Sequence, residues 1–277
     1  MSPSGTVHGH RAADSAGIGW AVGTARAGRH LADQPFAGDD GSAVPAVEAA
    51  LAALAQARSP ADAGAGAARP DPGALLRAQA GVVAALAGTR LLVPIVAVLG
   101  EGSEAVAAEG DKNADMALVT LTGRRDGRKA LPAFTSVATC AAWDAKARPV
   151  PVEAERAALA AVAEGCDVVV LDPAGPVTCL VGRPAVWALG QNRSWTPAPF
   201  DDAVRAAVAE AATGVPGVVS AVCEPGRSAE TAVVVEVVPG LTRDEIDDLA
   251  RAVGDRLAAS DVVADRVESV ELRLVSA

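Results

Sequence analysis

Apolar runs of β-strand length alternate along this chain with apolar stripes at helical spacing. The longest run, residues 91–99, has nine residues and contains Pro94, so no segment approaches the roughly 18–20 apolar residues of a membrane-spanning helix. Strand-length runs separated by helical stripes are typical of α/β proteins with mixed sheets. Because 277 residues suggest about two domains, we expect a soluble two-domain protein of the α+β or α/β class.

The first domain is expected at residues 43–191, as an α/β domain with a mixed sheet of about five strands. Ser42 and Asp71 can cap two helices, and Pro94 lacks the N–H of a ladder donor, which predicts an edge strand or a bulge. Strands are expected at residues 91–98, 116–121, 129–134, 167–171 and 177–181. Further helices are expected from Ser136 to Trp143, at 153–164 and at 184–191.

A smaller αββαβ domain is expected at residues 201–277, after a linker at 192–200 that contains two prolines. Thr242 and Glu245 have the spacing of a capping box, in which each side chain bonds the other residue's backbone N–H. The segment 231–238 is expected to form a hairpin with an exposed edge. Exposed edges pair with other chains, so a homodimer is a possible partner arrangement.

Residues 1–42 form a tail that we expect to be disordered, because Gly, Ser, Ala and His dominate it without an apolar period. His8 and His10 lack a third ligand for a metal. Glycines at residues 17–23 do not follow a strand, as a dinucleotide fingerprint requires. No charged region followed by an apolar region begins the chain, which favours the cytoplasm over secretion.

The charge distribution argues against nucleic acid as a general partner. The net charge is −10, and residues 201–277 hold 15 acidic and 7 basic residues. Such a surface repels phosphate backbones, so we expect no DNA partner. All three histidines lie in the tail, and the four cysteines have no C-x-x-C spacing and sit among apolar residues. We therefore predict no catalytic, cofactor-binding or metal-binding residues.

Four stretches resemble one known family. They are FAGDDGS at 36–42, KNADMALVTLTG at 112–123, ALPAFTS at 130–136 and VVLDPAGP at 169–176. Together they resemble the SseB N-terminal domain over about residues 35–191, in the version of high-GC Gram-positive bacteria. The excess of 21 arginines over three lysines fits such a genome. The region 201–277 is similar in layout to the family's C-terminal domain.

The resemblance implies a cytoplasmic protein without established catalytic residues or cofactor. The family takes its name from enhanced serine sensitivity, which suggests a link with amino-acid or sulfur metabolism. A non-enzymatic binding or regulatory protein, with an unknown protein partner or small-molecule ligand, is therefore our first functional hypothesis.

Two polar groups are candidate ligand or partner contacts. Asp39 and Asp40 precede a helix start, where they can cap the helix or contact a cation or amine. Lys112, Asn113 and Asp115 mark the entrance of a strand, where polar groups either line a ligand cleft or bond their own turn. An enzyme that uses carboxylates and Lys112 for acid–base chemistry is the second functional hypothesis.

A third group gathers at a hairpin tip, where Arg124, Arg125, Arg128 and Lys129 surround an aspartate. It forms either a solvated turn or a surface for an anionic partner, and it is the basis for a third hypothesis, an accessory protein of translation. Aromatic residues for stacking RNA are lacking near it. Trp143 and Trp187 are expected to be core or interdomain anchors, and Trp195 to pin the two domains together.

Overall fold

The computed structural model describes residues 36, 38–59, 70–98, 115–123 and 127–277. Of these, the residues from Asp40 to Ala277 belong to one compact unit, which contains two large hydrophobic clusters. Helices and strands mix in both halves of it, which confirms the mixed α+β class. The division into domains at 43–191 and 201–277 stays a prediction. No helix in the described part of the chain is long and apolar enough to cross a membrane.

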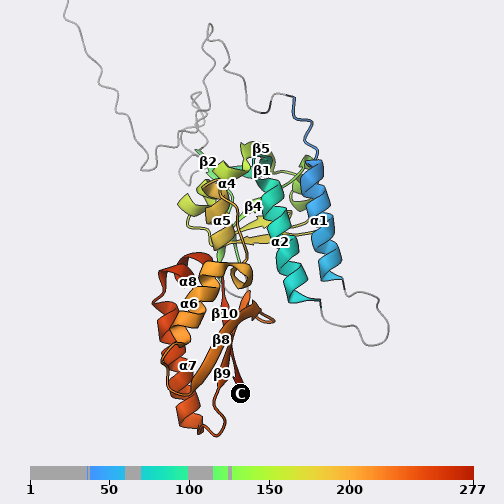
Figure 1. The fold of residues 1–277 in the computed structure, drawn as a ribbon. Coiled ribbons are helices and arrows are strands. Elements are labelled where there is room, and N and C mark those ends of the chain that lie inside the picture. The colour runs from blue at the N-terminus through green and yellow to red at the C-terminus, as the bar shows by residue number, and fades with distance from the viewer. Residues whose placement is uncertain (1–35, 37, 60–69, 99–114, 124–126) are drawn as a thin grey trace, which may run out of the picture. The chain divides into compact units, whose positions relative to one another are not determined.

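The first two helices of the unit, α1 (Pro45–Arg58) and α2 (Pro72–Leu86), pack against each other (Figure 1). Each begins with a proline, whose missing N–H costs nothing in the first turn. Asp71 caps α2 as predicted, because its carboxylate accepts the N–H groups of Gly73 and Ala74. The predicted Ser42 cap is wrong, since Val44 is the N-cap of α1 and offers no side-chain acceptor.

Seven strands of the first half form two sheets instead of the expected single sheet of about five. One is antiparallel with the order β2-β1-β5, and the other has the order β3-β4-β6-β7 with β4 and β6 parallel. Reciprocal 2.8 Å hydrogen bonds between Leu92 and Phe134 join them. The strands are β1 (Arg90–Val98), β2 (Asp115–Leu118), β3 (Leu121–Thr122), β4 (Lys129–Ala133), β5 (Arg148–Glu153), β6 (Val168–Leu171) and β7 (Cys179–Gly182).

The prediction that Pro94 marks an edge strand is wrong, because β1 lies between β2 and β5. Pro94 pairs with Pro149 in β5. Leu92 donates its N–H to Phe134, so alternation places the Pro94 nitrogen at that same edge of β1, between Phe134 and the end of β2. A central strand therefore tolerates this proline where its partner changes.

Three helices complete the first half: α3 (Val137–Trp143), α4 (Ala154–Ala163) and α5 (Arg183–Gly190). Ser136 caps α3 through a capping box with Thr139, as its position predicted. Four alanines of α4 are buried, and α4 packs against α5. Small side chains let these elements approach closely, which is how an Ala- and Val-rich sequence fills its core. The buried alanines are Ala154, Ala157, Ala158 and Ala161.

The second half has the order αββααβ, one helix more than predicted. Its sheet runs β10-β9-β8, with β9 and β10 parallel, and the helices cover one face of it (Figure 1). The elements are α6 (Asp202–Ala212), β8 (Val218–Pro225), β9 (Thr231–Val237), α7 (Arg243–Ala258), α8 (Asp261–Arg266) and β10 (Val270–Ser276). The capping box of Thr242 and Glu245 is confirmed.

The exposed edge predicted at residues 231–238 is wrong. That segment is β9, the central strand of its sheet, and five of its seven residues are buried. A Val-rich sequence is typical of a buried strand that lies in the middle of a sheet. The edge strand therefore no longer supports a homodimer, and the homodimer itself stays a prediction.

The second part of the expected linker at 192–200 packs against its surroundings, whereas Asn192, Arg193, Ser194 and Thr196 are exposed. It ends in a short 3-10 helix, η2 (Ala198–Phe200), whose first two residues are buried. The guanidinium of Arg77 in α2 lies 4.5 Å from the centre of the Phe200 ring, a cation–π contact. This contact holds the end of the segment against α2.

Candidate functional site

The predicted carboxylates at 39–40 lie in a turn before α1. Asp40 accepts the Ser42 N–H through Oδ1 at 2.8 Å, and Asp39 donates its own N–H to the Phe36 carbonyl. Gly41 has φ +79°, and its carbonyl accepts the Val137 N–H at the start of α3. A Cβ atom on Gly41 would lie 2.6 Å from Val137 Cγ2, so only glycine fits. Asp40 thus shapes a turn.

A buried charged network beside this turn was missed by the sequence analysis. Arg90 is 7% exposed and donates to the carbonyls of Thr135 and Ser42, each at 2.5 Å. Asp172 is 2% exposed and accepts both the backbone N–H of Thr135, at 2.9 Å, and its hydroxyl, at 2.7 Å. Three of the four stretches that carry the family resemblance therefore converge here.

This network is built to hold backbone segments together. Asp172 adopts φ +48°, and a Cβ atom on Gly175 would lie 2.8 Å from Asp172 Cβ. Buried charges persist only when their hydrogen bonds are satisfied, and these are satisfied by the protein's own groups. A signal was present in the sequence, since residues 169–176 read as a strand followed by an aspartate and a tight turn.

The described part of the basic hairpin is used inside the molecule. The Arg128 guanidinium lies 2.7 Å from the Glu268 carboxylate, and Lys129 Nζ donates to the Glu164 carbonyl at 2.6 Å. Arg124 and Arg125 lie outside the described residues. A surface for an anionic partner at this tip therefore stays a prediction that rests on those two arginines.

Several other candidates also lie outside the described residues: Lys112, Asn113, His8, His10 and the glycines at 17–23. Asp115 is placed by its backbone, opposite Val98 at the start of β2. Within the described ranges, no group of three or more His, Cys, Asp and Glu residues could hold a metal ion.

The cysteines have the environment of apolar core residues. Cys140, Cys166 and Cys179 are buried, and Cys223 is half-buried. Burial raises the pKa of all four thiols above the ordinary value, to about 11 for Cys179 and Cys223. Desolvation disfavours the thiolate, which is the nucleophilic form.

The tryptophans differ sharply in environment. Trp143 packs on Phe134 in a small core cluster, with ring centres 5.5 Å apart, as expected of a core anchor. Trp187, predicted to be a core or interdomain anchor, is 42% exposed, so the core alternative is wrong and the interdomain alternative stays a prediction. Trp195 packs in part against the first hydrophobic cluster, and its indole N–H is buried without a hydrogen-bond partner.

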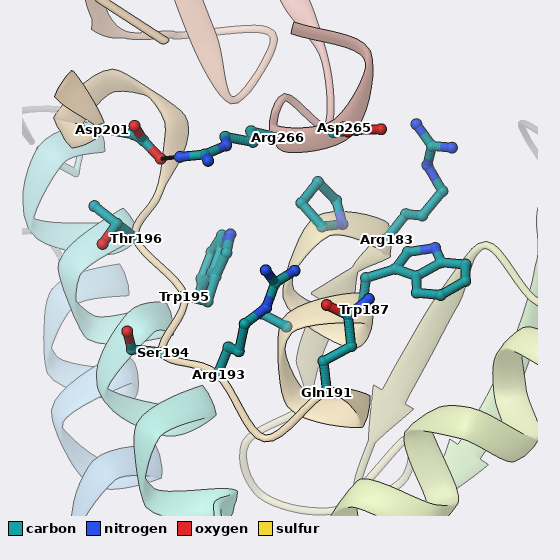
Figure 2. Close-up of a pocket in the computed structure, with 12 residues that line it drawn as sticks. Arg183, Trp187, Gln191, Arg193, Ser194, Trp195, Thr196, Asp201, Asp265 and Arg266 are labelled. Carbon is teal, nitrogen blue, oxygen red and sulfur yellow. Dashed lines mark hydrogen bonds and ion pairs between the residues drawn. The ribbon is translucent and has the colours of Figure 1, made fainter. Parts of the chain in front are cut away.

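Trp187 and Trp195 line the same pocket, which has a volume of about 720 Å³ and opens between α5, the segment after it and α8 (Figure 2). We call it the Trp–Arg pocket. Three arginines and two aspartates contribute its charge, and the indole nitrogen of Trp195 lies on the side of the ring nearer Arg266 (Figure 2). Its lining residues are Arg183, Pro184, Trp187, Ala188, Gln191, Arg193, Ser194, Trp195, Thr196, Asp201, Asp265 and Arg266.

The charged groups of the pocket differ in how they are held. Arg266 forms a 2.9 Å ion pair with Asp201, which also caps α6, and Arg183 donates to the Ala264 carbonyl at 2.8 Å. Arg193 is exposed and forms no side-chain hydrogen bond or ion pair with any described residue. Arg193 is therefore a donor available to a ligand, and the Trp195 indole N–H is a buried donor that lacks an acceptor among the described residues.

Comparison with known proteins found a family match within the first half of the chain. Residues 73–188 match the family model of the SseB protein N-terminal domain. Over these residues the chain is similar to the SseB N-terminal domain. The match confirms the resemblance over α2 to α5, where the network of Arg90 and Asp172 lies, and its extension to residues outside 73–188 stays a prediction. Searches of the curated proteins and of the solved structures found no match.

The Trp–Arg pocket lies where the SseB domain ends. Arg183, Pro184, Trp187 and Ala188 belong to the matched residues, whereas the remaining lining comes from the segment after them and from α8. Sequence reasoning singled out both tryptophans but none of the pocket's charged residues. Asp265 and Arg266 lie 70 and 71 residues after Trp195 in the chain, so no local pattern could have revealed them.

Two glutamates hold the residues around the pocket in place. The Glu268 carboxylate accepts the Arg183 N–H at 2.9 Å, at the start of α5 in the SseB domain. Glu230 accepts the Glu268 N–H at 2.8 Å and the Ala198 N–H at 3.2 Å. Burial raises the pKa of Glu230, and these two backbone hydrogen bonds partly offset the effect. Hydrogen bonds from the backbone to these two carboxylates therefore fix the segments around the pocket.

Proposed function

We propose that this SseB-domain protein is a non-enzymatic binding protein and that the Trp–Arg pocket holds its ligand or partner. One observation carries the proposal: the buried indole N–H of Trp195 lacks an acceptor at the side of an open pocket. A buried donor without a partner costs about 1–3 kcal/mol. An acceptor supplied by a bound molecule would recover that energy.

The groups around the pocket support binding more than catalysis. Trp187 and Arg193 are both exposed and line one pocket, and Trp and Arg are among the residues most enriched at binding hot spots. The described thiols have raised pKa values, which suits a structural role. A volume of about 720 Å³ is in the range of ligand sites.

Site-specific photo-cross-linking tests the proposal in cells. A photo-reactive amino acid replaces Gln191 at the pocket or, as a control, Arg251 on the exposed side of α7. We expect a discrete cross-linked product from position 191 that is absent from position 251. The product should disappear when Trp187→Ala and Arg193→Glu are added. A product that survives both changes would refute the pocket as the binding site.

A small-molecule ligand is tested in parallel by thermal shift. The compounds to be tested include serine, cysteine and nucleotides. They are chosen because we propose that the protein acts in the bacterial cytoplasm and is linked, like its family, to serine sensitivity. A specific ligand raises the melting temperature by mass action. The shift should be lost in Arg193→Glu and kept in Arg251→Glu, which makes the same charge change on an exposed helix face.

The enzyme and translation hypotheses rest on Lys112, Arg124 and Arg125, which lie outside the described residues. Both hypotheses are therefore carried by the sequence alone. The binding hypothesis is the one that a described site supports.

A further inference from the structure

The chemistry of the Trp–Arg pocket narrows what it can bind, and this step rests on the function proposed above. Two donors of the pocket lack a hydrogen-bond partner among the described residues: the Trp195 indole N–H and the Arg193 guanidinium. Neither can accept a hydrogen bond. The matching ligand must therefore bring acceptor oxygens, and the planar fork of an arginine favours a carboxylate or a phosphate.

The charge of the lining distinguishes between these two anions. Arg183, Arg193 and Arg266 face Asp201 and Asp265, which leaves one net positive charge. Asp201 is already neutralised by Arg266 at 2.9 Å. A carboxylate carries one negative charge, whereas a phosphate monoester carries about −1.5 to −2 and is repelled more strongly by Asp265. The lining therefore matches a single carboxylate.

The form of the pocket favours a peptide over a free metabolite. Small-molecule sites usually bury 70–90% of their ligand. Here Gln191, Arg193, Ser194 and Thr196 are all exposed around the pocket, and the Trp187 ring is 42% exposed. An open surface of this kind can take a chain that enters and leaves it, with the Trp187 ring contacting an apolar neighbour of the acidic group.

We infer that the Trp–Arg pocket binds a protein partner through a carboxylate that lies next to an apolar side chain. The carboxylate accepts hydrogen bonds from the Trp195 indole N–H and from the Arg193 guanidinium. The apolar neighbour packs on the Trp187 ring and on Pro184.

Nitrogen-15 NMR of the full chain reads the proposed contact directly, since each of its four tryptophans gives one indole N–H signal. Trp195→Phe identifies the Trp195 signal. Four N-acetylated dipeptides serve as probes. Acetyl-Leu-Glu-amide carries a side-chain carboxylate and acetyl-Leu-Gln with a free C-terminus a terminal one. Acetyl-Leu-Gln-amide is neutral, and acetyl-Leu-phosphoserine-amide carries a phosphate.

We expect one or both carboxylate peptides to move the Trp195 signal downfield in a saturable manner, and which one does so identifies the source of the carboxylate. The core Trp143 signal should stay in place. Arg193→Ala should weaken the carboxylate peptide about tenfold, as the loss of one charge-assisted hydrogen bond implies. Arg251→Ala should leave its affinity unchanged.

Other outcomes overturn the inference in distinguishable ways. If the neutral or the phosphorylated peptide binds as well as the carboxylate peptides, the ligand class is wrong while binding at the pocket stands. If no peptide moves the Trp195 signal but position 191 still cross-links through Trp187 and Arg193, the class is again wrong and the proposed function survives. If the cross-link fails as well, both fall together.

Discussion

Glu268 is the side chain whose removal best tests how the pocket is held. Its carboxylate accepts the Arg183 N–H at the first residue of α5 and pairs with the Arg128 guanidinium at 2.7 Å. It therefore caps a helix from a segment 85 residues later in the chain. Glu268→Ala removes both contacts and leaves the last strand otherwise intact.

The expected loss follows from the two contacts. Loss of a capping acceptor costs about 1 kcal/mol. Arg128 is 41% exposed and Glu268 is 25% exposed, so solvent screening limits the ion pair to about 0.5 kcal/mol. The free energy of unfolding should fall by about 1.5 kcal/mol, and a chain of this size then melts about 3–6 °C lower.

Gly182 offers an internal check through a double-mutant cycle. It has φ −71°, which alanine adopts easily, but a Cβ atom there would lie 2.7 Å from Glu268 Oε2. Gly182→Ala should destabilise the wild type and cost less in the Glu268→Ala background. Urea unfolding of the four proteins, with Arg128→Ala as the ion-pair control, measures this. Additive effects, or a Glu268→Ala loss no larger than that of Arg128→Ala, would refute the capping role.

Three further predictions concern buried or strongly bonded groups. Asp172→Ala should lower the free energy of unfolding by about 3 kcal/mol in urea titrations, because Thr135 loses its acceptor in a buried site, whereas the exposed Asp167→Ala should cost under about 1 kcal/mol. The pKa of Cys179, at about 11, keeps this thiol protonated at pH 8, so iodoacetamide should label it about 100-fold more slowly in the native protein than in urea; equal rates would contradict its burial. Hydrogen bonds from residues 227 and 228, with that of the Ser228 hydroxyl foremost, lower the pKa of Glu271 to about 2, so its stabilisation is complete above pH 4.5 and is lost as pH falls toward 2. The stability gap between the wild type and Glu271→Gln should therefore narrow from pH 6 to pH 2.5, and a constant gap would count against this bonding.

Local signals predicted most of the helices correctly, because helix ends are encoded by neighbouring residues. Asp71, Ser136 and Thr242 cap α2, α3 and α7 as their positions indicated. The first cap failed because Pro45 starts α1 after Val44, a start that needs no side-chain acceptor. The short helix α8 was missed because six residues carry too little periodicity to be recognised.

Strand pairing was harder to predict, because it joins residues far apart in the sequence. Strand β5 was not predicted because it contains Pro149 and Pro151. Both prolines lie opposite residues of β1, Pro94 and Leu92, whose backbone nitrogens point away from β5. These positions form no hydrogen bonds between β1 and β5, so the prolines remove none. For the same reason, residues 231–238 were wrongly predicted to lie at a sheet edge, although β9 has a partner strand on each side.

The sequence by itself determined the class of the protein, the starts of α2, α3 and α7, the SseB resemblance and the apolar character of the cysteines. Each of these depends on composition or on residues within a few positions of one another. The tertiary structure alone decided that Trp187 is exposed and that Trp195 and Arg193 meet Arg266 across one pocket. The physical reason is that exposure and pocket charge depend on which distant segments pack together, and here a glutamate near the end of the chain caps the helix that carries Trp187.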